Sequence, residues 1–503
     1  MPNYIGIDLG TTYSAVATID DAGRPIIIEN EDKIASPKGN ITASTILLLE
    51  SGMLVGDQAR KVLGLNPNAV ARFKRIMGTS EVVTLSGKDY TPTDLSALVL
   101  KDLKRLAESG VDELSKVVVT IPANFSNEAR SATMDAAKLA GLDVEFLINE
   151  PTAAALHYAF KNGKSLNGIY AVYDLGGGTF DISIISIDGN DIQVIASNGL
   201  ARLGGDDFDR ELIRLVQKKY LDETGEALDE ELYTLTNAET DKIALSKKKK
   251  IVAGGDDQEV DGQQLFVTRS EFDEAISSLL AQAELTCDAT LTEAQVDKSE
   301  IKGVILVGGS TRMQCVAQSV ERIFGQQPIT TENPDEAVAL GAALYAAIKS
   351  DGANLSTAQK KAVEKVKVGE VANHYFGTIS IGELAGKQAL TNSILIKKGT
   401  KIPCSTTDSF YTVSENQTSV HCRVTQSDSP ETDPRWVKTI WEGELELPPN
   451  RPAEQEVQIT YSYDDNQIMH CTFKDVSSGK ETDAMISQTN STASSAIDKF
   501  LVD

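Results

Sequence analysis

Two short segments of the chain repeat one pattern, an apolar run that ends on an aspartate and continues into glycine and threonine. The first is Tyr4–Ser14, with the acid at Asp8, and the second is Tyr170–Ser183, with the acid at Asp174. A tight turn of this composition between two strands points several backbone N–H groups into one concavity, which attracts anions. Glycine also lets a phosphate approach the backbone closely. The pattern predicts one phosphate site built from two related halves.

The two acids suit a magnesium ion, which usually keeps several waters and binds through few carboxylates together with substrate phosphates. We therefore expect Asp8 and Asp174 to hold a hydrated Mg²⁺ while the turns hold the β- and γ-phosphates of a nucleotide. Two ordinary hairpins with capping acids are the alternative, and the repetition disfavours it. A third turn, Val307–Met313, follows an apolar run. Its two glycines allow close approach of a nucleoside, and Arg312 can stack on a base.

The composition sets the class of protein. A chain of 503 residues is too long for one hydrophobic core, so at least two domains are expected. The formal net charge of -25 repels phosphate backbones and argues against nucleic acid as a general partner. The five cysteines show neither a disulfide framework nor metal-ligand spacing. The sequence contains no apolar run of about 18 residues and no leading signal segment. We therefore expect a cytoplasmic protein without a membrane partner.

Apolar runs and helical patterns alternate along residues 1–349, which is typical of an α/β domain. The strands predicted there are 25–29, 116–121, 169–174, 182–187, 192–197 and 303–307. One helix is predicted over 127–140, closed by Gly141, and a second opens at Asp206. A third is predicted to begin at the Asn333-Pro334 cap signal and to run to Lys349.

The pattern changes in the last third of the chain. Short period-2 runs separated by polar turn clusters predict an all-β domain at 371–487. The polar, lysine-rich segment 350–370 is interpreted as an interdomain linker with a short helix at 357–365. Residues 488–503 form a C-terminal tail with room for one short helix. The run Lys247–Lys250 is interpreted as a solvated helix end.

Taken together, the three glycine turns resemble the ATP site shared by actin, sugar kinases and DnaK. The closer resemblance is to the DnaK family, the seventy-kilodalton heat-shock chaperones. The segments that carry it are 5–14, 147–155, 172–183, 203–209, 305–313 and 333–343. It implies a two-lobed actin/hexokinase-like ATPase, made of duplicated ribonuclease-H-like halves and followed by an all-β sandwich. It also implies a slow ATPase that binds ATP or ADP with Mg²⁺, and optionally K⁺.

The resemblance further implies roles for individual residues. Catalysis would fall to Lys74, Glu150, Asp181 and Thr179. The lysine ammonium would neutralise developing charge and help to place the attacking water. Glu150 and Asp181 would orient that water or the magnesium shell, and Thr179 would lie near the γ-phosphate. The nucleotide and its metal would be bound by Asp8, Gly10, Thr11, Thr12, Tyr13, Asp174, Gly176, Gly177, Gly178, Gly204, Gly205, Glu239, Lys242, Ser246, Gly308, Gly309, Ser310, Arg312 and Asp335.

In the β domain the resemblance implies a groove for an extended peptide, with main-chain hydrogen bonds for affinity and an apolar pocket for selectivity. Phe410, Val413, Val420 and Cys422 would face that groove, although ordinary core packing is an equal alternative for them. The partners implied are unfolded client polypeptides, a J-domain co-chaperone and a nucleotide exchange factor, in a protein-folding and stress-response role.

Two other functions compete with a chaperone. An actin-like filament protein would also bind ATP but has no need of an appended β domain. A sugar or acid kinase needs an acceptor pocket with a base for the hydroxyl group of its substrate.

Several departures from the family pattern bear on regulation. The family's helical lid is absent, so the chain is either lidless or truncated. The linker sequence Val366–Glu370 replaces the family's leucine run ending in an aspartate. Phe146 stands where many members carry an arginine that meets J-domain partners, and the segment 79–91 is shorter than in DnaK. We therefore expect an intact ATPase core with weakened coupling.

Overall fold

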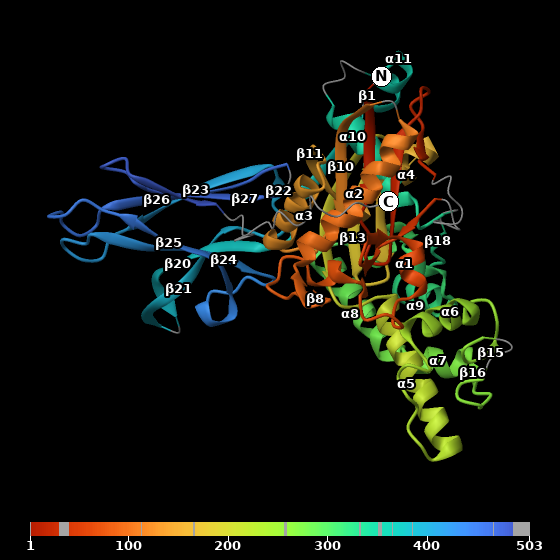
Figure 1. Ribbon diagram of the computed structural model, residues 1–503. Helices are drawn as coiled ribbons and strands as arrows, with labels where there is room; N and C mark the ends of the chain where they lie inside the picture. The colour runs from red at the N-terminus through yellow and green to blue at the C-terminus, as the bar shows by residue number, and fades with distance from the viewer. Residues whose placement is uncertain are drawn as a thin grey trace. The chain divides into compact units, whose positions relative to one another are not determined.

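The computed structural model describes residues 2–29, 40–111, 113–163, 166–255, 259–330, 333–350, 355–364, 366–384, 386–465 and 467–485. These residues divide into two compact units, coloured along the chain in Figure 1. The first comprises 2–125 and 133–368, and the second comprises 126–132 and 369–485. Among the described residues, no helix is long and apolar enough to cross a membrane. The predicted tail at 488–503, and with it the question of a lid, lies outside the described residues.

The first unit contains two sheets of the same topology, each built around one of the repeated hairpins. The first sheet has the order β11 (Val144–Asn149), β10 (Glu113–Ile121), β1 (Pro2–Asp8), β2 (Tyr13–Ile19), β3 (Pro25–Ile27). The second has the order β18 (Ile329–Thr330), β17 (Ile301–Val307), β12 (Asn167–Leu175), β13 (Phe180–Asp188), β14 (Asp191–Leu200). In each, the hairpin is antiparallel and its first strand pairs in parallel with a later strand. The repetition in the sequence is thus a repetition of half-domains, as expected.

Helices cover these sheets, which explains why the central strands are almost wholly apolar. The long helices are α2 (Pro92–Gly110), α3 (Asn127–Leu139), α4 (Glu150–Asn162), α5 (Gly205–Thr224), α6 (Leu235–Leu245), α8 (Ser277–Ala294), α9 (Gln314–Phe324) and α10 (Ala337–Lys349). α10 lies directly on β1, because a Cβ at Gly6 would come within 2.1 Å of the Ala343 nitrogen. Gly341 allows the same close approach to α4, where its Cβ would come within 1.8 Å of the Ala153 oxygen.

Shorter elements complete the first unit. They are β4 (Thr42–Ala43), β5 (Thr45–Leu49), β6 (Gly52–Val55), α1 (Asp57–Lys61), β7 (Ala69–Ala71), η1 (Phe73–Ile76), β8 (Val83–Leu85), β9 (Lys88–Tyr90), β15 (Lys250–Val252), β16 (Phe266–Thr268), α7 (Arg269–Ala275), η3 (Lys298–Glu300), η4 (Gly309–Arg312) and α11 (Thr357–Val363). α11 belongs to this unit although it lies in the segment interpreted as a linker. Its N-terminal region is bound to the hairpin after β2, where Gln359 Nε2 donates to the Asp20 carbonyl at 3.1 Å.

The strands predicted at 169–174, 182–187, 192–197 and 303–307 each lie inside an observed strand, and the 127–140 helix is α3. The helix predicted through 337–349 is confirmed as α10, but the N-cap predicted at Asn333 is wrong. α10 begins at Ala337, with Glu336 at its N-cap and no side-chain cap. The Asn333 side chain instead accepts a hydrogen bond from Arg312 Nη2 at 3.3 Å. The capping pattern is therefore present in the sequence, but the Asn333 side chain binds Arg312 instead of the helix N-terminus.

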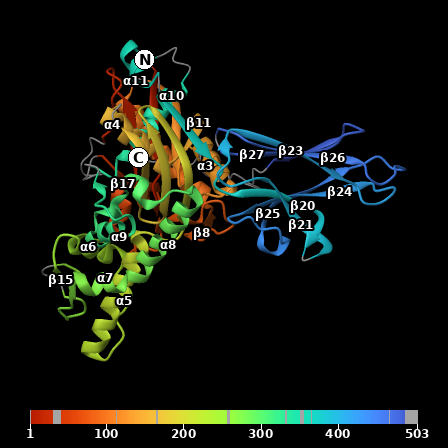
Figure 2. The same ribbon diagram turned by 180° about the vertical axis from the view of Figure 1, so that it is seen from behind.

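The second unit is a sandwich of two antiparallel sheets, which lie face to face in Figure 2. One has the order β21 (Lys387–Ile396), β20 (Tyr375–Leu384), β24 (Ser419–Ser427), β25 (Lys438–Glu446), and the other β23 (Cys404–Tyr411), β26 (Glu456–Tyr463), β27 (Met469–Asp475), β28 (Glu481–Met485). β19 (Lys367–Val371), β22 (Lys401–Ile402) and η5 (Pro434–Trp436) are also present. Phe376, Tyr461 and Phe473 are fully buried between the sheets. The period-2 pattern thus predicted this unit correctly.

One ion pair anchors the end of β27 in the sandwich. Arg451 binds Asp475 with both guanidinium Nη atoms, at 2.6 and 2.9 Å, and the Asp475 side chain is 0% exposed. The backbone N–H of Ser478 also donates to this carboxylate, at 3.1 Å. The hydrogen bonds from Arg451, the largest cause, lower the pKa of Asp475 to about 2.

A carboxyl group with a lowered pKa stabilises the fold above its unfolded-state pKa of about 4, and that stability is lost as the pH falls toward about 2. We predict that Asp475→Asn lowers the unfolding temperature of the second unit at pH 7, because it leaves Arg451 without its charged partner. The variant should also lose less stability than the parent protein between about pH 5 and pH 2.

Tryptophan fluorescence reports this unfolding selectively, because the only two tryptophans, Trp436 and Trp441, belong to the second unit. Glu481→Gln is the matched control, since its pair with Lys474 spans 3.7 Å between side chains that are about half exposed. Equal acid sensitivity of Asp475→Asn and the parent protein would contradict the assignment.

Candidate functional site

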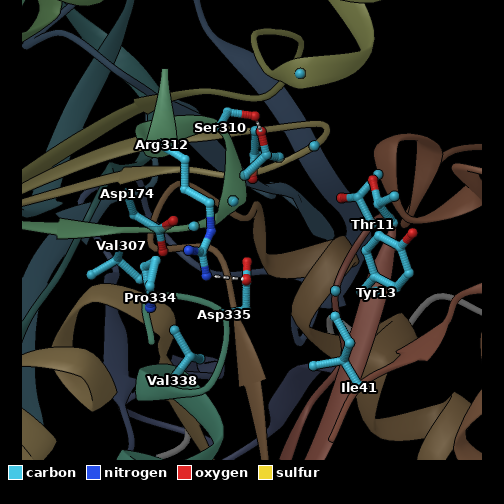
Figure 3. A pocket seen from close by; sticks show the side chains of 18 of the residues that line it. Thr11, Tyr13, Ile41, Asp174, Val307, Ser310, Arg312, Pro334, Asp335 and Val338 are labelled. Atoms are coloured by element: carbon cyan, nitrogen blue, oxygen red, sulfur yellow. Dashed lines mark hydrogen bonds and ion pairs between the residues drawn. The ribbon is translucent and has the colours of Figure 1, made fainter. Parts of the chain in front are cut away.

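A cleft of about 580 Å³ opens between the two half-domains of the first unit, and Figure 3 shows it from close by. Most of the residues expected to bind a nucleotide line it. They are Asp8, Gly10, Thr11, Thr12, Tyr13, Lys74, Glu150, Asp174, Gly176, Gly177, Thr179, Gly205, Glu239, Lys242, Gly308, Gly309, Ser310, Arg312 and Asp335. Figure 3 shows the Arg312 side chain reaching to Asp335. Thr11 and Tyr13 lie apart from this pair, on the other side of the cleft. Segments far apart in the sequence therefore meet in one place.

Of the two strand-end aspartates, Asp174 is buried and Asp8 is half-buried, and both are close to other acids. Thr120 Oγ1 donates to Asp8 Oδ1 at 2.9 Å. Burial, reinforced by the nearby Glu150 charge, raises the pKa of Asp8 to about 7. Burial also raises the pKa of Asp174 well above its ordinary value, with further contributions from the charges of Glu150 and Asp181. Such crowding of carboxyl groups favours a cation, so these residues fit a hydrated Mg²⁺ ion.

The two glycine turns approach each other at the floor of the cleft. A Cβ at Gly177 would lie 2.0 Å from Thr12 Oγ1, and a Cβ at Gly178 would lie 2.5 Å from Thr11 Cγ2. Only glycine fits at these two positions. Thr12 Oγ1 is buried and has no hydrogen-bond partner among the described residues. It is therefore a donor available to a ligand oxygen, as the phosphate prediction requires.

The N-terminus of α5 is fixed to the second turn. The Gly205 N–H donates to the Gly176 carbonyl at 3.0 Å, and the Asp206 N–H donates to the Gly177 carbonyl at 2.8 Å. A helix N-terminus carries partial positive charge, which favours an anion nearby. This end of the cleft thus suits the polyphosphate part of a nucleotide.

Lys74 is a buried cation among the acids of the cleft. It lies on the short turn η1, and its Nζ is 2.6 Å from Glu150 Oε1. The Lys74 side chain is 4% exposed, and Glu150 is the first residue of α4. The ammonium also lies 5.7 Å from the centre of the Phe125 ring. Lys74 and Glu150, two of the predicted catalytic residues, are therefore held in fixed positions at the cleft floor.

The opposite end of the cleft is lined by paired side chains. Lys242 Nζ lies 2.8 Å from Asp209 Oδ1 and donates to the Gly205 carbonyl at 2.9 Å. Glu239 forms an ion pair with Arg60, whose guanidinium carbon lies 4.9 Å from the centre of the Tyr13 ring. Arg60 was not predicted from the sequence, because a lone arginine on the short helix α1 carries no signal.

Four of the expected site residues do not line the cleft but lie behind it. Gly178 packs between Thr11 and Arg75, and a Cβ at Gly204 would lie 2.6 Å from the Gly177 carbonyl carbon. Ser246 Oγ donates to the Lys242 carbonyl at 3.1 Å. Asp181 is 1% exposed and accepts a hydrogen bond from the Asn124 N–H at 3.2 Å. These residues support the lining rather than form its surface.

Residues that sequence reasoning missed also line the cleft. They are Asn40, Ile41, Asp206, Asp209, Ile243, Lys247, Val307, Asn333, Pro334 and Val338. Lys247 belongs to the exposed lysine run, which follows the end of α6 as expected. The apolar members had no sequence signal because an isolated aliphatic residue is more often part of the core.

The four candidate peptide contacts in the second unit have different environments. Val413 is 64% exposed, whereas Phe410 and Val420 are half-buried against the core. Cys422 is 1% exposed inside that core, so its predicted place on a groove surface is corrected to a core position. Burial raises the pKa of the Cys422 thiol to about 12. Period-2 alternation places a residue on one face of a strand but does not tell a groove from the interior.

A comparison with protein families gives an independent result. The family model described as Hsp70 protein matches residues 4–503 of this chain. The match spans both units and includes every cleft residue described above.

We predict that Gly177→Ala weakens the binding of Mg²⁺-ATP, because the added methyl group would overlap Thr12 Oγ1. Forcing a methyl group into a packed contact costs about 1–3 kcal/mol, which corresponds to roughly 5- to 100-fold in affinity. Titration calorimetry with Mg²⁺-ATP measures the change. The control is Gly87→Ala, where a Cβ meets nothing within 4 Å; its left-handed backbone (φ 75°) makes alanine strained there, so it shows what backbone strain away from the cleft does to ATP affinity. Equal affinities for the two variants would contradict the assignment of the turn.

Proposed function

Because the chain belongs to the Hsp70 family of ATP-dependent chaperones, we propose that it hydrolyses ATP slowly and binds extended apolar segments of unfolded proteins. ATP hydrolysis is assigned to the cleft of the first unit and client binding to the second unit. The observation that carries the proposal is the convergence of two glycine turns, two strand-end aspartates and the Lys74–Glu150 pair in one cleft. The family match favours this function over an actin-like filament protein or a sugar kinase.

The residues of the cleft divide the work of hydrolysis. Asp8 and Asp174 would hold Mg²⁺ through water, and the ion supplies charge neutralisation on the phosphates. Lys74 presents its ammonium where negative charge grows during phosphoryl transfer. Thr179 and Glu150 orient the attacking water, and Asp181 supports the second turn from behind. Glu150 Oε1 lies 2.6 Å from the Lys74 ammonium nitrogen, so the pair holds both side chains in fixed positions.

Client binding is proposed along the open edges of the sandwich. β21 and β23 each lie at the end of a sheet order, so each has one side with no neighbouring strand in its sheet, where an extended peptide would add. Apolar side chains are exposed nearby, with Leu390 53% exposed on β21 and Tyr411 59% exposed on β23. Val413 follows β23 and is 64% exposed. These features support binding of an apolar strand-like segment.

We extend the proposal to the protein's setting. It includes a cytoplasmic location. It also includes a nucleotide exchange factor and a J-domain co-chaperone as partners, because the family generally uses co-chaperones. Phe146 packs edge-on against Tyr345, with ring centres 6.4 Å apart, and the Lys349 ammonium lies 5.1 Å from the centre of the Phe146 ring. An aromatic ring cannot donate the charge-assisted hydrogen bonds of a guanidinium. Stimulation by an unrelated J-domain protein should therefore be weak.

We predict that Lys74→Ala slows ATP turnover by roughly 10²–10³-fold, which is the usual effect of removing one preorganised charge-stabilising group. Phosphate release is measured at saturating ATP, and ATP affinity is measured separately. Arg24→Ala is the control, because that side chain is 73% exposed and its ion pair is with Asp20 on the same hairpin. Turnover within a few-fold of the parent, with ATP still bound, would exclude Lys74 from catalysis.

We predict that Val413→Asp weakens binding of a fluorescent apolar peptide about tenfold, because a charge replaces an exposed apolar contact. Fluorescence anisotropy with the full chain measures the affinity. Val476→Asp, at a side chain that is 42% exposed elsewhere on the sandwich, is the matched control. Equal losses in both variants would place the peptide elsewhere.

A further inference from the structure

Two arginines bracket Lys74 on the turn η1, and both reach the other half of the first unit. Arg72 Nε lies 2.8 Å from Asp206 Oδ1, and Arg75 Nη2 lies 2.9 Å from Asp207 Oδ2. Both acids lie in the first turn of α5. The turn that carries Lys74 is therefore bound across the cleft to the helix that contacts the second phosphate turn.

The pair formed by Arg72 is not explained by local structure. Asp207 also caps α5, since it accepts a hydrogen bond from the Gly204 N–H at 2.9 Å. Asp206 has no such capping bond, yet its side chain is only 3% exposed and that of Arg72 is 13% exposed. Desolvation largely offsets the attraction within a buried ion pair, so such a pair is weak evidence for a role in stability. The alternative is that the Arg72–Asp206 pair positions a residue of the cleft.

The backbone of Arg72 supports a role for its side chain. Its φ is 67°, in the left-handed region that residues with a Cβ rarely adopt. Glycine would adopt this conformation more easily, so an arginine at this position has a strained backbone. Strained backbone of this kind is concentrated at functional sites.

A continuous path of contacts joins Lys74 to the second phosphate turn. The turn is bound to α5 by the Asp206 N–H, which donates to the Gly177 carbonyl at 2.8 Å. The Asp206 side chain then meets Arg72, which caps η1, and η1 carries Lys74. A Cβ at Gly178 would lie 3.0 Å from Arg75 Cγ, so the turn and η1 are also in direct contact.

We propose that the Arg72–Asp206 pair positions Lys74, so that the lysine reaches its working place only when the two halves of the cleft are closed. Arg72 acts through Lys74 and does not itself contact the phosphates. The proposal rests on the ATPase function proposed above.

The test compares ATP binding with the hydrolysis of bound ATP in a single turnover. Arg72→Gly removes the guanidinium and relieves the backbone strain, so a loss of rate reflects the lost ion pair. We expect the single-turnover rate to fall about tenfold or more, because small misplacements of a catalytic group have effects of this size. ATP affinity should change less than about threefold, which is the split expected for a transition-state role. Arg72→Lys should recover part of the rate, and Arg24→Gly should match the parent.

A second variant separates positioning from folding. Arg72→Gln combined with Asp206→Asn removes both charges and leaves no unpaired buried charge, and it should show the same selective loss of rate. Unchanged hydrolysis in Arg72→Gly or in the double variant overturns the proposal, as does a loss of ATP affinity equal to the loss of rate. If the proposed ATPase function itself were wrong, the result would differ. The parent protein would then not hydrolyse ATP, and Lys74→Ala would have no effect.

Discussion

The structure of the cleft depends on the mutual repulsion of buried carboxylates. Asp8, Asp174, Glu150 and Asp181 lie close enough for their charges to influence one another, and a single ammonium, that of Lys74, lies among them. Removal from water opposes ionisation of Asp8 and Asp174, and so do the neighbouring acids. The protein tolerates this arrangement because Lys74 pairs with Glu150 and because the site suits a further cation. Every nearby element holds one of these charged groups or closes the space around them.

The fold supplies this arrangement by placing two copies of one half-domain around the cleft. Each copy contributes a strand that ends in an acid and a turn rich in glycine, and the two turns meet at the cleft floor. Side chains outside the copies then complete the site. Lys74 comes from η1 and Glu150 from the start of α4, so neither belongs to the repeated hairpin. The duplicated hairpins thus account for the cation and phosphate parts of the site, while the Lys74–Glu150 pair comes from elements outside the hairpins.

The part of the site that could be predicted from sequence is the part encoded by local patterns. The Asp-Gly-Thr turns were recognisable because their spacing is short and occurs twice. Lys74 and Glu150 became identifiable only through family resemblance, since an isolated lysine or glutamate usually lies on the surface. The Arg60–Glu239 and Arg72–Asp206 pairs join residues more than a hundred positions apart and have no local signature. At Asn333 the error is the opposite, because a local pattern was present but misleading. The sequence predicts a helix cap there, whereas the side chain accepts a hydrogen bond from Arg312.

The contact between Thr12 and Gly177 also constrains how such a site can arise. The hydroxyl of one turn occupies the space where the equivalent turn would carry a side chain. Two identical half-domains with threonine in both turns would clash where the turns meet. Two with glycine in both would close but would lose the buried hydroxyl. This contact therefore requires the two turns to differ in sequence, which is possible because both copies belong to one chain and can carry different residues.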